Sequence, residues 1–176
     1  MTLRGIKPPI WRRILMPASM TLDDLHVAIQ RTMGWEDSHL HDFDVAGERY
    51  GDPTNTDDVA DESRLPLSAL VEAGVHHFAY TYDFGDNWEH TVLVEKSHPP
   101  ANAKPWPACT AGKRRCPPED CGGTWGYADL LQILANPAHP QHEEQREWAG
   151  EEFDPDAFSV VEADAALAAA FRRPKH

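Results

Sequence analysis

The sequence predicts a single α+β domain, with a mostly antiparallel sheet and helices packed on one side of it. Segments with a two-residue period and segments with helical periodicity follow one another without strict strand–helix–strand alternation, which disfavours a parallel α/β fold. A length of 176 residues with 41% hydrophobic residues suits one core. We therefore expect one domain over residues 1–176.

The first strand is predicted over residues 10–16, because this apolar run lies between prolines. A helix should follow it. Thr21 is a favourable N-cap, apolar residues recur at helical spacing over residues 22–33, and Gly34 ends the run. One apolar face of this helix is expected to pack on the sheet.

The segment 39–45 alternates with a two-residue period, which predicts a strand with His39 and His41 on one face. A short helix is expected over residues 66–73. The clearest hairpin lies between residues 76 and 97, where four aromatic residues alternate with smaller or polar ones before a turn at residues 85–87. Since four aromatic side chains on one side of a strand require burial, this hairpin should be central to the sheet.

Residues 97–126 are rich in proline, glycine and cysteine and match neither periodic template, so we expect a long ordered loop there. Helices are then predicted over residues 125–135 and 141–149. A last helix should begin at Ser159, because Glu162 three residues later completes a capping box.

The composition restricts the partners and the compartment. A formal net charge of −13 should repel nucleic acid, because duplex binding needs clustered Lys and Arg. The three cysteines cannot all pair, and the sequence has neither a signal-peptide pattern nor a span of about 20 apolar residues. We therefore expect a cytoplasmic protein without a membrane partner. A protein partner and any oligomeric state remain open.

The hairpin turn concentrates ionisable and aromatic residues, namely Asp83, Asp86, Trp88 and His90. Turn formation by itself accounts for acidic residues at such a place. If Asp83 and His90 face each other across the strand pair, they can instead coordinate a cation or form an acid–base pair.

His39 and His41 offer two imidazoles at i and i+2, a spacing that lets one strand supply two metal ligands. The same spacing also occurs in ordinary hydrogen-bonded pairs. A third ligand, such as His90 or Asp83, is needed to make it a metal site.

Cys109, Cys116 and Cys121 lack the two-residue gap of zinc ribbons. Glu119 and Asp120 lie beside them, so a mixed thiolate and carboxylate site is one interpretation. A redox pair and buried apolar thiols are the others. The sequence contains neither a Gly-x-Ser-x-Gly nucleophile motif nor a phosphate-binding glycine motif, so no complete catalytic signature is present.

Several blocks together resemble the plasmid pRiA4b ORF-3-like family: residues 5–13, 25–35, 39–43, 82–86, 116–123 and 153–155. The resemblance implies an α+β domain of bacteria and archaea, sometimes found in plasmid or transposon contexts. It also implies that an edge strand leading into Gly5 is shortened or absent here. Some members carry a resolvase-like label, which this sequence does not support, because it has no convincing nucleophile with an arginine cluster.

The leading hypothesis is a binding or interaction module with a polar pocket that holds zinc or another divalent cation. The candidate pocket comprises His39, His41, Asp83, Asp86, Trp88, His90, Glu119 and Asp120, and the candidate metal ligands are His39, His41, His90, Cys109, Cys116 and Cys121. A metal-dependent hydrolase or nuclease-like enzyme using the turn carboxylates is the second hypothesis. The third is a partner-binding accessory protein of a mobile element, whose exposed Trp residues and acidic surfaces dock a basic protein.

Overall fold

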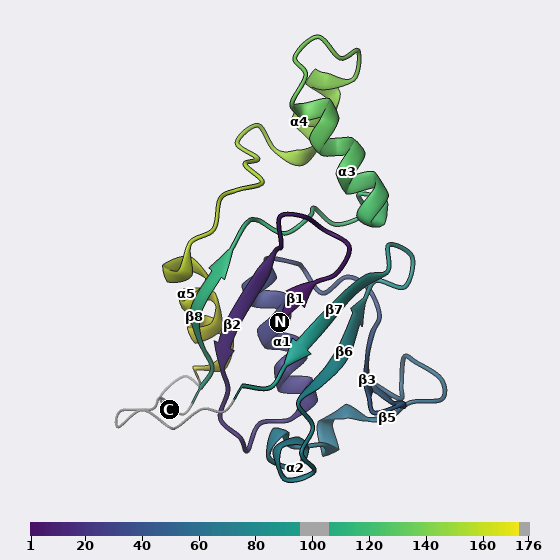
Figure 1. Ribbon diagram of the computed structural model, residues 1–176, viewed down its shortest axis with the longest axis vertical. Helices are drawn as coiled ribbons and strands as arrows, with labels where there is room; N and C mark the ends of the chain where they lie inside the picture. Colours follow the sequence, from purple (N-terminus) through teal and green to yellow (C-terminus); the bar gives the residue numbers. More distant parts are fainter. Residues whose placement is uncertain (96–105, 173–176) are drawn as a thin grey trace.

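One mixed, mostly antiparallel sheet organises the protein in the computed structural model (Figure 1), which describes residues 1–95 and 106–172. Within these residues the strand order is β5-β4-β3-β6-β7-β1-β2-β8, and only β4 and β5 pair in parallel. The strands are β1 (Thr2–Leu3), β2 (Trp11–Leu15), β3 (His41–Val45), β4 (Glu48–Gly51), β5 (Ala60–Asp61), β6 (His77–Tyr82), β7 (Trp88–Leu93) and β8 (Ala108–Lys113). The predicted fold class is confirmed.

The helices differ in how they meet this sheet. They are α1 (Leu22–Met33), the 3-10 helix η1 (Glu62–Arg64), α2 (Leu67–Glu72), α3 (Gly123–Leu134), α4 (His142–Ala149) and α5 (Val160–Phe171). Helices α1 and α5 pack against each other behind the strands, whereas α3 and α4 project beyond one end of the sheet (Figure 1). Among the residues described, no helix combines the length and the apolar character that crossing a bilayer requires.

Helix α1 begins and ends where the sequence predicts. The Thr21 hydroxyl accepts a hydrogen bond from the backbone N–H of Asp24, and the Asp24 carboxylate accepts one from the Thr21 N–H. Gly34 ends the helix at φ 94°, and its N–H donates to the carbonyl of Gln30. The apolar face of α1 enters the main core beside aromatic residues of β3 and β6.

The central hairpin is also confirmed, with one exception. β6 and β7 pair antiparallel in the middle of the sheet, and Phe78, Tyr80 and Tyr82 are buried on one face. Phe84 does not continue this face, because it lies in the turn beyond β6 and is 43% exposed.

The proline-rich and cysteine-rich segment is not a single loop. Part of it, residues 96–105, lies outside the described residues, but β8 follows and pairs antiparallel with β2 under α5. Its sequence, from Ala108 to Lys113, lacks large apolar side chains, so periodicity does not reveal it. Glycine is required at position 112, since a Cβ there would lie 2.4 Å from a ring carbon of Phe158. Helix α3 also begins earlier than predicted, at Gly123.

The strand that leads toward Gly5 is present and short, as the resemblance implies, but it lies inside the sheet and not at its edge. β1 is two residues long and pairs with both β2 and β7. Leu3, opposite His90, is buried, and the Met1 ammonium group donates a 2.8 Å hydrogen bond to the carbonyl of Arg12.

Two buried histidines make stability depend on pH. Burial lowers the pKa of His90 to about 3, and burial together with a neighbouring histidine lowers the pKa of His26 to about 4. Both groups are therefore neutral in the folded protein over a pH range in which an unfolded histidine takes up a proton. Their contribution to stability is complete above about pH 6.5 and decreases as the pH falls toward these lowered values.

We predict that the free energy of unfolding falls by roughly 1 kcal/mol per pH unit for each of these histidines between pH 6.5 and pH 4. His90→Gln should remove one of the two contributions and flatten the curve. His77→Gln is the matched control, because His77 is exposed on the neighbouring strand. Urea unfolding at a series of pH values measures the effect, and a stability independent of pH would contradict it.

Candidate functional site

A cavity of about 720 Å³ lies between α1, β3 and the acidic segment after β4. Three histidines line it, His26 on α1, His41 on β3 and His39 just before β3. Five carboxylates also line it: Asp23, Asp37, Asp52, Asp61 and Glu62. The histidines divide into two groups that differ in how their ring nitrogens are used.

The first group surrounds one nitrogen of His39. Its Nε2 lies 3.2 Å from Oδ1 of Asp120, 3.7 Å from Oε2 of Glu119 and 3.7 Å from Oδ2 of Asp83. This Nε2 is buried, yet it makes no hydrogen bond to any described residue. Ligand atoms of His39, Asp83 and Asp120 all lie within 4.8 Å of one another. We call His39, Asp83, Glu119 and Asp120 the His39 site.

Local backbone geometry orients two of its carboxylates. Asp83 adopts φ 55° directly after β6, and its Oδ1 accepts hydrogen bonds from the N–H groups of Gly85 and Asp86. The other oxygen, Oδ2, is the one near His39. Asp120 also adopts a left-handed conformation, at φ 56°. Aspartate tolerates this region better than most residues, which accounts for its use at both turns.

Hydrogen bonds hold the segment that carries Glu119 against the sheet. The Glu119 carboxylate accepts from the Tyr82 hydroxyl at 3.0 Å and from the N–H of Glu36 at 2.9 Å. The indole N–H of Trp35 donates to the carbonyl of Pro117 at 3.0 Å. The structure thus brings the cysteine-rich segment, the central hairpin and the residues before β3 to one place.

Asp86 has a different task from Asp83. Its Oδ2 accepts a 3.1 Å hydrogen bond from the N–H of Gly122, immediately before α3. Gly122 and Gly123 have φ values of 88° and 66°, and a Cβ on Gly123 would lie 2.5 Å from the Asp86 carbonyl oxygen. The hairpin turn therefore holds the first turn of α3 through contacts that only glycine permits.

The buried residues of β7 do not reach the His39 site. The register pairs His90 with Tyr80 and Trp88 with Tyr82, so the condition that His90 faces Asp83 across the strand pair is not met. β6 ends one residue before Asp83, which belongs to the turn. His90 and Trp88 are 0% exposed in the core. A hydrolase built on His90 and the two turn carboxylates therefore has no common site among the described residues.

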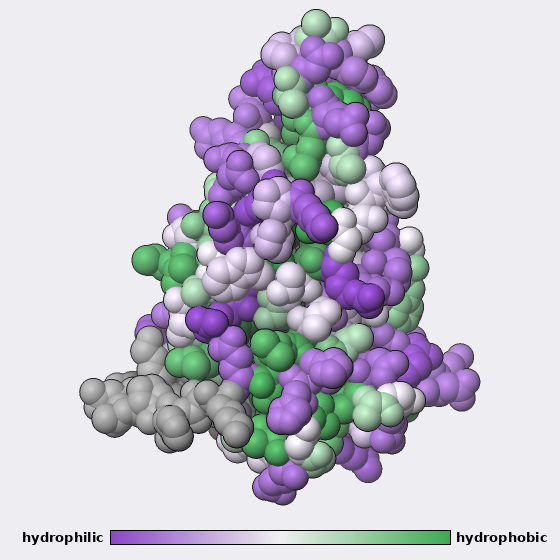
Figure 2. All heavy atoms as spheres, viewed as in Figure 1, coloured by the Kyte–Doolittle hydropathy of each residue, from purple (hydrophilic) through white to green (hydrophobic). Residues whose placement is uncertain are grey.

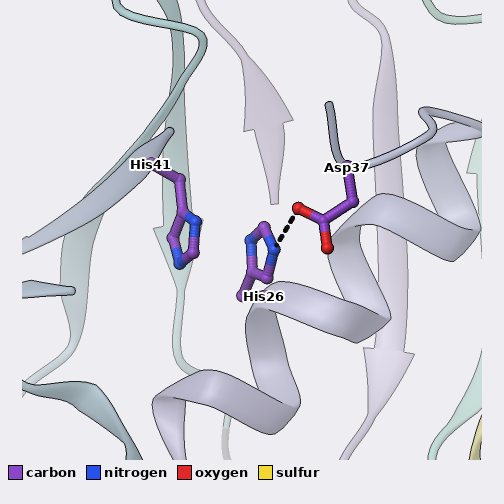
Figure 3. A group of neighbouring side chains, drawn as sticks. All are labelled: His26, Asp37 and His41. Atoms are coloured by element: carbon purple, nitrogen blue, oxygen red, sulfur yellow. Dashed lines mark hydrogen bonds and ion pairs between the residues drawn. The ribbon is translucent and has the colours of Figure 1, made fainter. Parts of the chain in front are cut away.

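The second group of histidines is stacked (Figure 3). The rings of His26 and His41 are 3.5 Å apart with an angle of 5° between their planes. An imidazole binds a metal through a lone pair in the plane of its ring, at about 2.0–2.1 Å for zinc. Two parallel rings at this spacing cannot both direct a lone pair at one ion. His41 instead contacts the buried Glu62, with Nε2 3.0 and 3.1 Å from its two carboxylate oxygens.

His26 belongs to a closed ring of four hydrogen bonds. The N–H of Asp37 donates to Oε1 of Gln30, whose Nε2 donates to the Tyr80 hydroxyl. This assignment leaves the Tyr80 hydroxyl to donate to Nδ1 of His26 at 2.9 Å, and Nε2–H of His26 to donate to Oδ1 of Asp37 at 2.8 Å. Both nitrogens of a neutral His26 are satisfied. The ring is a structural device that connects α1 to β6.

Sequence reasoning did not identify His26 and its partners as a group. The available signal was the position of His26 on α1, four residues after Leu22 and three before Ile29, both fully buried. A histidine on the apolar face of a helix needs buried hydrogen-bond partners. Which residues supply them depends on tertiary contacts with Tyr80 and Asp37.

The sequence profile of the plasmid pRiA4b ORF-3-like protein matches residues 1–162. The chain belongs to the plasmid pRiA4b ORF-3-like family. A relative from Sinorhizobium fredii (strain NBRC 101917 / NGR234), the uncharacterized protein y4hQ, is 39% identical over 152 residues, which are 85% of this chain and 78% of the relative.

A solved structure shares the fold. The crystal structure of MM3350, a protein of unknown function from Methanosarcina mazei Go1, is similar with a TM-score of 0.84 and 41% sequence identity. The match covers 91% of this chain and 92% of that one. This chain therefore shares its architecture with an archaeal protein.

The thiols of this pRiA4b ORF-3-like protein belong to neither histidine group, although Cys121 directly follows Asp120 in the chain. Cys109 packs under α5, Cys116 lies in the main core, and Cys121 is partly buried. Burial raises the pKa of Cys116 and of Cys121 to about 12, which favours neutral thiols. No candidate metal group among the described residues contains a cysteine. The carboxylates beside them, not the thiols, reach His39.

We predict that Tyr80→Phe destabilises the protein by roughly 1–3 kcal/mol, because it leaves buried polar groups of His26 and Gln30 without their partner. Tyr50→Phe is the matched control. The Tyr50 hydroxyl bonds to Glu48 at an exposed position, so its loss should cost less than about 0.5 kcal/mol. Urea unfolding at pH 7 distinguishes the two, and equal losses would contradict the structural role of the ring.

Proposed function

We propose that this protein is a binding module that holds a divalent metal ion at the His39 site. The observation that carries the proposal is the state of His39 Nε2, a buried nitrogen without a hydrogen bond that lies among three carboxylates. A buried ring nitrogen without a hydrogen bond is uncommon and calls for an explanation. A cation bound between the imidazole and the carboxylates supplies one.

The spacing of the candidate ligands supports the same proposal. Bonds of 2.0–2.2 Å from zinc to nitrogen and oxygen place tetrahedral ligand atoms roughly 3.3–3.6 Å apart. The distances from His39 Nε2 to the carboxylate oxygens, 3.2–3.7 Å, bracket this separation. Small side-chain adjustments would therefore suffice to form the site.

The chemistry of the ligands favours certain metals. Imidazole is a common ligand of zinc and carboxylates are common ligands of manganese, so a site with one imidazole and several carboxylates suits either ion. Asp120 is the most accessible ligand, with a side chain that is 73% exposed. An ion could thus enter from the solvent on the side of Asp120 and retain a water molecule there. The second histidine group does not serve this role, since its rings are stacked and bonded to other partners.

We predict that zinc or manganese binds with a stoichiometry of one and raises the melting temperature, because ligands that bind only the folded state stabilise it. His39→Ala and Asp120→Asn should each weaken binding by roughly tenfold or more. Isothermal titration calorimetry of protein stripped with chelator measures the affinity.

His41→Gln is the discriminating control, because it alters only the stacked group. It should leave metal binding unchanged. Loss of binding in His41→Gln together with retention in His39→Ala would place the ion in the other group. Protein that contains no metal when purified and gives no binding heat would refute the proposal.

A further inference from the structure

Helices α3 and α4 form a helical arm, residues 123–152, that projects beyond the end of the sheet (Figure 1). Its sequence contains six acidic residues and one arginine, a net charge of −5 within a chain of −13. The acids are Asp129 on α3 and Glu143, Glu144, Glu147, Glu151 and Glu152 on and after α4. The arm therefore holds five of the thirteen net negative charges of the chain in 30 of its 176 residues.

A groove of about 390 Å³ runs between the two helices of the arm. Leu130 and Ile133 of α3 contribute apolar side chains to it, and Trp148 of α4 lines it while 49% exposed. Asp129 and Glu144 lie on its lining from opposite helices. The groove thus combines the exposed Trp148 ring with carboxylates on both sides, and Figure 2 shows hydrophobic residues among hydrophilic ones over this part of the molecule.

The arm carries a second exposed tryptophan, which is not among the residues that line the groove. Trp125 is 88% exposed on α3, four residues before Asp129, so both side chains lie on the same helix face. Tryptophan is enriched among the residues that contribute most to protein interfaces. The arm thus exposes two tryptophans, of which Trp148 lines the groove.

We propose that the groove of the helical arm is a docking surface for a basic amphipathic segment of a partner protein. Lysine or arginine side chains of that segment would pair with Asp129 and Glu144, and its apolar side chains would pack on Trp148. Charge complementarity selects this occupant. A second copy of this chain would bring another net charge of −13 to the acidic arm, and nucleic acid would bring phosphates.

The docking surface is independent of the proposed metal site, except at Asp120, which lines the groove and also contacts His39. Asp120 is therefore left unchanged in the test. The probe is a short synthetic amphipathic helix of leucine and lysine. Two control peptides replace lysine with glutamate or leucine with serine. Titrations follow tryptophan fluorescence and heat, with circular dichroism to verify that each variant is folded.

The leucine–lysine peptide should bind with an affinity that decreases as the salt concentration rises, since screening weakens the ion pairs. Both control peptides should bind roughly tenfold more weakly or worse. Trp148→Ala and Glu144→Gln should each reduce the affinity by roughly tenfold. The matched controls Val161→Ala and Glu72→Gln, both exposed on helices outside the arm, should not.

Unchanged affinity in Glu144→Gln and Trp148→Ala would overturn the proposal. Equal binding of the leucine–glutamate peptide would also overturn it, because charge would then play no part. Light scattering measures the molar mass in solution. A dimer that Trp148→Ala converts to a monomer would show that a second copy of this chain occupies the groove, which would also overturn the proposal.

Discussion

The hydroxyl of Tyr82 connects the centre of the sheet to the segment that approaches it from outside. It accepts a hydrogen bond from the N–H of Ser38 and donates to the carboxylate of Glu119. Ser38 precedes His39 and Glu119 precedes Asp120, so one phenol sets the positions of residues on both sides of the His39 site. The start of α3 follows only a few residues later, which makes the arm depend on the same connection.

The histidines of the two groups lie between residues 26 and 41, yet their ring nitrogens have different partners. His26 is neutral and has both nitrogens bonded, and His41 stacks on it while contacting a buried carboxylate. His39 has an imidazole nitrogen that is removed from solvent without a hydrogen bond. His26 and His39 therefore differ in whether both ring nitrogens are hydrogen-bonded, and His39 differs from the fully buried His90 in having carboxylates around its unbonded nitrogen.

Sequence patterns predicted the elements whose signals are local. The Thr21 cap, the Gly34 stop and the alternating aromatic residues of β6 each act over a few residues, and the structure follows them. β8 escaped prediction because its residues, Ala108 to Lys113, include no large apolar side chain and therefore show no apolar period, and its Gly112 packs closely under Phe158, just before α5.

The residues of the His39 site could be predicted only in part, because the contacts that form it are not local in sequence. The alternation over residues 39–45 predicted one shared histidine face, but β3 begins at His41, so His39 lies outside the ladder and turns toward other partners. The association of His39 with Glu119 spans eighty residues of sequence, and no periodic pattern reports such a distance.

The contact between Gly123 and the Asp86 carbonyl has an evolutionary consequence. Because backbone meets backbone there, with no side chain between to absorb a change, the β6–β7 turn and the first turn of α3 cannot drift separately. A relative that lengthens the turn should carry a compensating alteration at the paired glycines, or else its α3 and α4 will leave the sheet in another direction.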